Sequence, residues 1–386
     1  MKAIKSVAFH YRPTPQTVEL LQTFRTMVND AIRICLKEDV KGRLTLRNRI
    51  YKEFKERYNA VSCFPYSVAE VAWSIVKKHR RWQRRPLARK LMLKMDSASY
   101  SLNYGIISLP FRKGGRLLVP LRYGDYQSSI LMDETLKRGS VTMTNTTIFI
   151  AFSKEIEVAS PVKRVGIDLN EKSLVESDCT KLDLSKAARL HTEYEIRRRN
   201  FFARHHGDWK VKQKFASSRR EKERVRQFLH KVAKQVVQKA KKNREGIILE
   251  GLKGIRYKSR RGNGDGPDRR RRIALWPFRQ LQNYIEYRAR WEGIPVEYVS
   301  ASWTSRTCHF CGFVNEKLKI TDREWLCPCG AILDRDLNAA INVERRGTIP
   351  CLGEVRPGAQ GTDEAVKGNE ATPAPILRVE ALKGSP

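Results

Sequence analysis

The sequence is short of acidic residues and contains no long apolar run. Its 386 residues include 41 Asp and Glu against 76 Lys and Arg, so the formal net charge is +35 at pH 7. No stretch resembles the run of about 20 apolar residues that crosses a bilayer, and the start lacks the pattern of a secretory signal peptide. The opening MKAIKSVAFHYRP alternates as a β-strand does. These absences argue against a membrane-spanning or secreted protein, and we expect a cytoplasmic one.

The excess of positive charge indicates a polyanionic partner. Like charges repel one another in a compact fold, and a bound polyanion offsets that repulsion. Nucleic acid is the strongest candidate, because phosphates neutralised by Lys and Arg release counterions. A solvated basic surface and an anionic membrane surface are the alternatives. A chain of 386 residues is expected to form two or three units, since a domain typically has roughly 100–200 residues.

The eight cysteines do not have the distribution of a disulfide framework. Four are scattered singly, and the other four lie in one short stretch: Cys308, Cys311, Cys327 and Cys329. The segment CHFC is the first half of a zinc ribbon, whereas Cys327-Pro328-Cys329 is one residue shorter than the usual second half. Clustered thiols indicate a metal site in a reducing compartment, so we predict bound Zn²⁺. The alternatives are a degraded site whose thiols only pack, and a site in which His309 replaces a ligand.

Three acidic residues stand at the ends of predicted elements. Asp168 ends an apolar strand at residues 164–169, Glu250 ends another at residues 246–250, and Asp336 opens a helix. Taken singly, an acid at a strand end is usually solvated and an Asp at a helix start is usually a cap. In this basic chain, two predicted strands and one predicted helix each carry an acid at one end. This combination predicts that the three acids share one site. Asp334 is the alternative third acid, and we interpret it as the helix cap.

A cluster of three carboxylates is typical of a site for divalent cations. Carboxylates held close together repel and raise one another's pKa values, and cations remove that cost. Mg²⁺ prefers oxygen ligands, so carboxylates together with substrate phosphates complete its shell. Two such ions roughly 4 Å apart can activate a water and stabilise the leaving oxygen of a phosphodiester. The sequence therefore predicts two Mg²⁺ ions at Asp168, Glu250 and Asp336.

These segments resemble the split RuvC motifs of the TnpB family, which comprises transposon-encoded nucleases related to type V CRISPR effectors and eukaryotic Fanzor proteins. The matching motifs are GIDLN, ILEGL and DRDLNAAINV, together with TSRTCHFCG at residues 304–312. Residues 276–299 resemble the helix and strand that precede the cysteines in that family, and HYRPTPQTVELLQTF resembles its N-terminal segment more loosely. The resemblance covers most of residues 1–345.

The resemblance implies an α+β multidomain fold. It comprises a helical recognition unit and a wedge β-barrel, followed by a RuvC/RNase H-like α/β nuclease domain with an inserted zinc ribbon. The implied boundaries are residues 1–12 for the first wedge strand, 13–98 for the helical recognition domain, 99–160 for the wedge β-barrel, 161–345 for the nuclease with its zinc ribbon at 304–333, and 346–386 for a disordered tail.

The resemblance also implies the activity and the partners. The expected protein is a prokaryotic, RNA-guided and magnesium-dependent DNA endonuclease in which Asp168, Glu250 and Asp336 are catalytic. Its partners would be a guide RNA from the transposon end and a double-stranded DNA target next to a short transposon-adjacent motif. It would exist as a monomer or a dimer. The alternatives are a miniature type V CRISPR effector, a guided DNA-binding regulator that does not cleave, and an unguided zinc-ribbon protein that binds nucleic acid.

Runs of arginine are the candidate nucleic-acid contacts. Arginines suit phosphate binding because the guanidinium group donates several hydrogen bonds. Charge runs are more often solvated faces, so we assign them as a surface and not as individual ligands. They are Arg197, Arg198, Arg199, Arg219, Arg220, Arg269, Arg270, Arg271 and Arg272.

Overall fold

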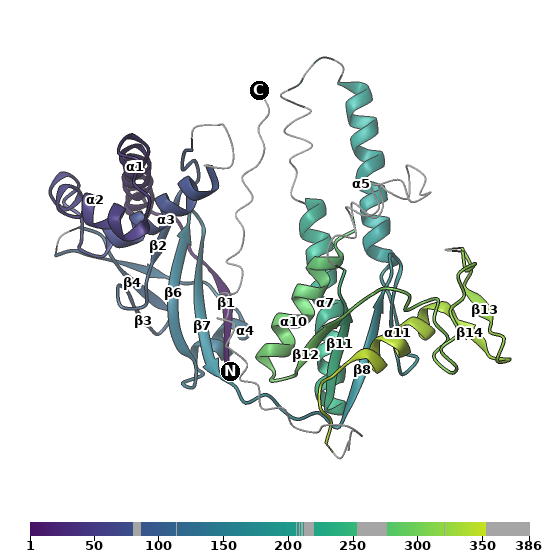
Figure 1. Ribbon diagram of the computed structural model, residues 1–386. Coiled ribbons are helices and arrows are strands. Elements are labelled where there is room, and N and C mark those ends of the chain that lie inside the picture. Colours follow the sequence, from purple (N-terminus) through teal and green to yellow (C-terminus); the bar gives the residue numbers. More distant parts are fainter. Residues whose placement is uncertain are drawn as a thin grey trace. The chain divides into compact units, whose positions relative to one another are not determined.

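The chain forms two compact units in the computed structural model, one spanning Lys2–Glu155 and the other beginning at Ile156 (Figure 1). No helix among the described residues is long and apolar enough to cross a bilayer. The structure describes residues 1–79, 86–112, 114–205, 207, 209, 211, 220–252, 276–319 and 321–352. The predicted tail therefore lies outside the described residues from position 353 onward.

The N-terminal unit combines helices with two antiparallel sheets. One sheet has the strand order β1-β7-β6-β2 and the other has the order β3-β4-β5. The helices are α1 (Pro15–Lys37), α2 (Arg43–Arg57), α3 (Phe64–His79) and α4 (Asp125–Leu131). The strands are β1 (Lys2–His10), β2 (Met92–Met95), β3 (Ser101–Asn103), β4 (Ile106–Pro110), β5 (Arg116–Pro120), β6 (Lys137–Thr144) and β7 (Thr147–Glu155).

Short-range chemistry sets the start of α1. The Thr14 side chain accepts a hydrogen bond from the Thr17 backbone N–H, and the Thr17 hydroxyl oxygen accepts one from the Thr14 N–H, so the two residues form a capping box. Pro15 occupies the first turn, where no backbone N–H is needed. Thr14 is therefore the N-cap of α1.

The sheets of the N-terminal unit draw strands from more than one of the predicted segments. The resemblance implies a wedge β-barrel that consists of residues 99–160 and a first strand at residues 1–12. Residues 99–160 contribute strands to two sheets, and one of these sheets also takes in β2 from within the predicted helical segment 13–98. A four-residue strand such as β2 acquires its hydrogen-bond partners only from β6, 46 or more positions further along the chain. Local periodicity cannot reveal such a pairing.

The second unit is built on a five-stranded sheet with the order β10-β9-β8-β11-β12. Strands β8, β11 and β12 are parallel, and β9 and β10 are antiparallel to their neighbours. The strands are β8 (Lys163–Leu169), β9 (Ser173–Glu176), β10 (Lys181–Asp183), β11 (Glu245–Glu250) and β12 (Val296–Val299), and a separate hairpin pairs β13 (Glu324–Leu326) with β14 (Ile332–Asp334). The helices are α5 (Ser185–Arg204), α7 (Arg220–Asn243), α10 (Phe278–Trp291) and α11 (Arg335–Arg346).

The core of the second unit explains its parallel strands. Every residue of β11 is buried, as are the last five of β8, and near-continuous apolar runs are typical of parallel strands covered on both faces. The apolar stripes of α7 and α10 pack into one cluster with these strands. Phe228 lies partly buried at the edge of the α7 stripe. Because β8 and β11 run parallel, their carboxyl ends meet at the same edge of the sheet.

Candidate active site

The three predicted acids lie together at that edge of the sheet. Leu249 pairs with Ile167, so that Glu250 and Asp168 each follow a paired residue on neighbouring parallel strands. Asp336 is the second residue of α11, which packs against β8. The side chains are almost fully buried, with Asp168 7% exposed and Glu250 and Asp336 each 6% exposed. We call these three residues the acid cluster.

Neutral donors hold the first two acids in place. The Asn170 side-chain amide donates a hydrogen bond of 2.6 Å to Asp168 Oδ2. The Thr304 hydroxyl donates one of 2.8 Å to Glu250 Oε1, and Thr304 is itself buried. Thr304 belongs to the TSRTCHFCG segment, so the residues before the cysteines reach back to the second acid. Neither Asn170 nor Thr304 was among the predicted site residues. Asn170 stands only two positions from Asp168, whereas the partner of Thr304 is 54 positions away and leaves no local signal.

Two arginines hold the third acid. Arg335 Nη2 lies 2.9 Å from Asp336 Oδ1, and Arg323 Nη1 lies 3.3 Å from Asp336 Oδ2. Asp334 is the N-cap of α11, because its Oδ1 accepts hydrogen bonds from the backbone N–H groups of Asp336 and Leu337 at 2.9 and 2.8 Å. The interpretation of Asp334 as a cap is confirmed, and of these two acids only Asp336 is buried.

Burial raises the pKa values of two acids, and neighbouring carboxylates raise one of these pKa values further. Burial raises the pKa of Asp168 well above its ordinary value, and the nearby Glu250 and Asp336 carboxylates raise it further. Burial also raises the pKa of Glu250 to about 7, against the opposing effect of the Thr304 hydrogen bond. In the chain without a cation, protons therefore reduce the charge of the cluster. A divalent cation would take over that role and displace them.

The raised pKa of Glu250 predicts how stability depends on pH. The Glu250 carboxyl keeps its proton up to pH about 7 in the folded state but releases it near pH 4.5 in the unfolded state. The stability that this protonated carboxyl contributes is therefore fully present below pH 4.5 and is lost as the pH rises to about 7. Glu250→Gln removes this loss and keeps an acceptor for Thr304. We expect the variant to be more stable than the wild type by about 3 kcal/mol at pH 8 without divalent cations.

Denaturant unfolding of both proteins between pH 5 and 8, in the presence of EDTA, measures this difference. The gap should shrink toward zero at pH 5 and should shrink at pH 8 when Mg²⁺ is added, since the ion stabilises only the wild-type cluster. A gap that is independent of pH would contradict the assignment of the raised pKa to Glu250.

A glycine allows α11 to approach the sheet. A Cβ atom placed on Gly166 of β8 would lie 2.1 Å from the Ala340 carbonyl oxygen and 2.4 Å from the Glu344 backbone nitrogen. Both atoms belong to the α11 backbone, so no side-chain rotation would relieve the overlap. The glycine of GIDLN is therefore what lets the helix that carries Asp336 lie directly against the strand that carries Asp168.

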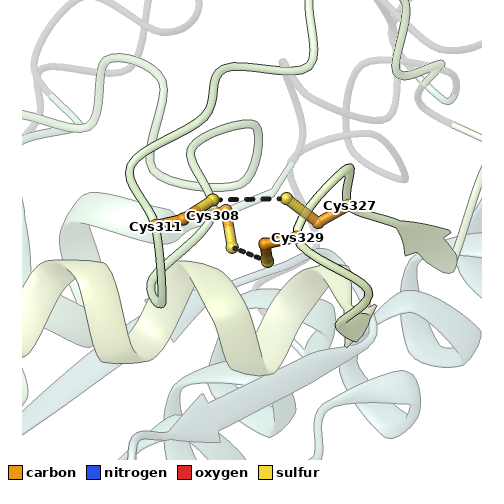
Figure 2. Close-up of side chains that lie close together, drawn as sticks. All are labelled: Cys308, Cys311, Cys327 and Cys329. Carbon is orange, nitrogen blue, oxygen red and sulfur yellow. Dashed lines mark hydrogen bonds between the residues drawn. The ribbon is translucent and has the colours of Figure 1, made fainter.

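The four clustered cysteines converge in space. Their Sγ atoms all lie within 4.8 Å of one another. The distance is 3.4 Å between Cys311 and Cys327 and 3.9 Å between Cys308 and Cys329 (Figure 2). A tetrahedral ion with Zn–S distances of about 2.3 Å requires sulfur atoms about 3.8 Å apart. The thiols thus fit a zinc ion, and the shortened Cys-Pro-Cys segment brings both of its sulfurs to the site. We call these residues the cysteine cluster.

The thiol pKa values show why this cluster suits a cation. Burial raises the pKa of Cys308, but hydrogen bonds from the backbone N–H groups of Cys311 and Phe310 outweigh it and bring the pKa down to about 7. Burial and the neighbouring thiols raise the pKa of Cys327 to about 12. One thiolate therefore forms near neutral pH while a second is opposed. A bound divalent cation favours all four thiolates together.

The predicted basic surface is only partly within the described residues. Arg197 lies over the Tyr194 ring on α5, with its guanidinium carbon 5.3 Å from the ring centroid, and Arg220 is exposed at the start of α7. Arg198 pairs with Glu221, and Arg199 pairs with Glu195 at 2.9 Å, so acids already offset these two charges. The remaining predicted contacts lie outside the described residues: Arg219, Arg269, Arg270, Arg271 and Arg272.

Comparison with known proteins relates the chain to RNA-guided nucleases. Residues 278–343 match the family model described as "Cas12f1-like, TNB domain". The chain is 31% identical over 246 residues to a TnpB-like protein of Methanocaldococcus jannaschii, a match that covers 60% of this chain and 86% of that protein. It is also 31% identical over 133 residues to a putative RNA-guided DNA endonuclease of Streptomyces pristinaespiralis, covering 34% of this chain and 31% of that protein.

The fold is similar to that of a solved structure. The chain superimposes on Cas12f1 from a cryo-EM structure of the Cas12f1–sgRNA–target DNA complex with a TM-score of 0.57 and 14% sequence identity. The match covers 86% of this chain and 83% of that one. At this level of identity the likeness concerns the mixed α/β fold alone.

Proposed function

Because this chain belongs to the TnpB family, we propose that it is an RNA-guided, magnesium-dependent DNA endonuclease of a transposon. The observation that carries the proposal is the acid cluster, in which two adjacent parallel strands and a helix start bring Asp168, Glu250 and Asp336 into one buried site. The strand order β10-β9-β8-β11-β12 supports a RuvC/RNase H-like assignment for the second unit. A net charge of +35 supports a nucleic-acid substrate.

The acid cluster supplies what two magnesium ions require. Asp168, Glu250 and Asp336 would hold the ions, which when bound activate water and stabilise the leaving oxygen of a DNA phosphodiester. Asn170 and Thr304 fix one oxygen each of the first two acids, so these carboxylates are oriented before an ion arrives. Arg335 and Arg323 offset the charge of Asp336 until then. Burial keeps bulk water from competing for the carboxylates.

The guide RNA and the DNA target are the proposed macromolecular partners. Exposed arginines of the second unit, such as Arg197 and Arg220, would contact phosphates and would contribute affinity that falls as salt rises. The M. jannaschii relative is TnpB-like and the S. pristinaespiralis relative is named as an RNA-guided DNA endonuclease. The guide is proposed to come from the transposon end, and the protein is proposed to act in a prokaryotic cytoplasm as a monomer or a dimer.

We also propose that the cysteine cluster holds one Zn²⁺ ion. Replacing Cys329, an exposed ligand, with Ser removes one of four thiolates. The expected result is a zinc dissociation constant about a hundredfold higher, because four ligands share a binding free energy of roughly 10–16 kcal/mol. Competition with a chromophoric chelator measures the constant. Cys179→Ser is the matched control, since Cys179 is exposed and lies outside the cluster. Equal zinc dissociation constants for the two variants would contradict the proposal that the cysteine cluster binds zinc.

A miniature type V CRISPR effector is a second candidate. The chain is 33% identical over 117 residues to the CRISPR-associated endodeoxyribonuclease Cas12f2 of a Micrarchaeota archaeon. This match covers 29% of this chain and 21% of that protein. A transposon nuclease and such an effector would share the acid and cysteine clusters. The origin of the guide separates them, because one derives from a transposon end and the other from a repeat array.

Sequencing the RNA that accompanies the protein tests the proposal. The gene is expressed with its native flanking DNA, the protein is purified, and the bound RNA is sequenced. One dominant structured RNA with a variable end supports guiding, and its origin identifies the element. The purified complex is then incubated with Mg²⁺ and plasmids that carry the guide-matched target beside randomised flanking DNA. Random cellular RNA, or no cleavage in any flanking context, would overturn the proposal.

A further inference from the structure

A set of buried polar side chains links the cysteine cluster to the acid cluster. Thr304, Asn338 and Asn342 are 4%, 1% and 8% exposed, respectively. Asn338 and Asn342 are four residues apart on α11, so they project from the same face of the helix. Buried amides are costly unless they are hydrogen-bonded. We call these three residues the polar clasp.

One end of the polar clasp holds the backbone around Cys308. The Asn338 Oδ1 accepts a hydrogen bond of 3.0 Å from the His309 backbone N–H. Its Nδ2 donates one of 2.8 Å to the Thr307 carbonyl oxygen. Asn342 Nδ2 donates to the same carbonyl at 2.6 Å. The residues immediately before and after Cys308 are therefore fastened to α11.

The other end of the polar clasp reaches two of the acids. The Thr304 carbonyl oxygen accepts from Asn342 Nδ2 at 2.8 Å and from Asn338 Nδ2 at 3.3 Å. The hydroxyl of the same Thr304 donates to Glu250 at 2.8 Å. Asn338 stands two residues after Asp336 on one rigid helix. Hydrogen bonds thus connect the backbone near Cys308 to Glu250 through Thr304, and they also connect it to the helix that carries Asp336.

We propose that the polar clasp couples the two metal sites, so that zinc in the cysteine cluster raises the affinity of the acid cluster for its divalent ions. This inference rests on the proposed function. Thr304, Asn338 and Asn342 act as positioning residues, because none of them is a candidate ligand in either cluster. Zinc orders the backbone at Cys308, and that order fixes the Thr304 hydroxyl and the α11 N-terminus.

The size of the coupling follows from comparable sites. Residues that orient metal ligands through hydrogen bonds typically change metal affinity by about 10–100-fold when they are replaced. We therefore expect removal of zinc to weaken divalent-ion binding at the acid cluster by about tenfold. Coupling between two binding sites is reciprocal, so filling the acid cluster should strengthen zinc binding by the same factor.

Mn²⁺ binding to the full chain provides a readout that does not depend on cleavage. Mn²⁺ takes oxygen ligands as Mg²⁺ does, and the EPR signal of the free ion reports how much is bound. The titration is run on the zinc-loaded chain and on the chain stripped with 1,10-phenanthroline. Asp168→Ala is the reference that lacks the acid-cluster site. The expected result is about tenfold weaker binding after zinc removal.

Variants of the polar clasp locate the coupling. Asn338→Ala should bind Mn²⁺ about tenfold more weakly with zinc present and should show no further loss when zinc is removed. Thr304→Val should weaken Mn²⁺ binding while zinc affinity is unchanged, and Thr304→Ser, which keeps the hydroxyl, should restore it. Asn315→Ala is the matched control, because Asn315 lies in the same cysteine-bearing segment and its side chain accepts from the Lys317 backbone N–H.

The outcomes separate this inference from the proposed function. Unchanged Mn²⁺ affinity after zinc is stripped from the wild-type chain overturns the coupling, and this test needs no variant to fold. If zinc removal weakens Mn²⁺ binding by Asn338→Ala as much as it does in the wild type, the role of the polar clasp is overturned. Equal Mn²⁺ binding by the wild type and Asp168→Ala overturns the acid-cluster site itself and, with it, the proposed function.

Discussion

Asp168→Asn is expected to slow DNA cleavage by about a thousandfold or more, which corresponds to roughly 4 kcal/mol of lost transition-state stabilisation. Asn keeps the size of the side chain and an oxygen atom, but it lacks the charge that binds divalent ions. Asp168 is buried among the acids at the end of β8, so no neighbouring carboxylate takes its place without a change in the backbone. Guide RNA and target DNA binding should persist, because the variant adds no bulk and removes no basic residue.

Two measurements on the purified complex check this expectation. Single-turnover cleavage of a guide-matched DNA gives the rate, and a filter-binding assay in EDTA gives the affinity. Asp183→Asn is the matched control, since Asp183 is an exposed acid of β10 in the same sheet. This variant should cleave DNA as fast as the wild type does. Cleavage by Asp168→Asn within tenfold of wild type would show that the acid cluster is not catalytic, and the regulator that binds without cleaving would then be favoured.

Gly166→Ala is expected to destabilise the second unit and to abolish cleavage without altering any acid. The added Cβ would lie 2.1 Å from the Ala340 carbonyl oxygen, so α11 must move away from β8. Overpacking of this kind typically costs about 1–3 kcal/mol, and contact with backbone atoms places this variant at or above the upper end. A loss of about 3 kcal/mol lowers the melting temperature by roughly 6–12 °C in a unit of this size. The shift of Asp336 would weaken divalent-ion binding as well.

Calorimetry of the chain and Mn²⁺ titration test the two parts of this prediction. Gly115→Ala makes the same chemical change where the nearest atom to the new Cβ is 3.7 Å away, and it should leave both quantities unchanged. If Gly166→Ala melted and bound Mn²⁺ as Gly115→Ala does, the close approach of α11 to β8 would not be needed to assemble the site.

Several features of this protein follow from local sequence. The cap and first turn of α1 depend on Thr14 and Pro15, and the apolar stripe of α7 depends on a 3.6-residue period, so both can be inferred without the rest of the chain. The residue types indicate the kind of ion that each cluster would bind, because carboxylates are hard ligands and thiolates are soft ligands. The motifs around them suffice to indicate the family.

Other features depend on contacts between distant segments. The predicted helical segment 13–98 includes β2, because a four-residue strand is defined by its pairing with β6 and not by its own pattern. Thr304, Asn338 and Arg323 were likewise not predicted, because their hydrogen bonds and ion pair depend on how the cysteine-bearing segment lies against α11. No period of 2 or 3.6 residues encodes these partners.

The sequence by itself determined which residues are candidates for metal binding, the large positive charge, and the helices whose starts and faces are specified locally. Only the tertiary structure decided that the acids of β8, β11 and α11 are almost fully buried, that two of them have raised pKa values, and that the cysteine cluster connects to them through the polar clasp. The physical reason is that side-chain chemistry belongs to single residues, whereas pKa shifts, close approach and buried hydrogen bonds belong to pairs. Such pairs arise only when parallel strands and the helix packed on them bring distant residues together.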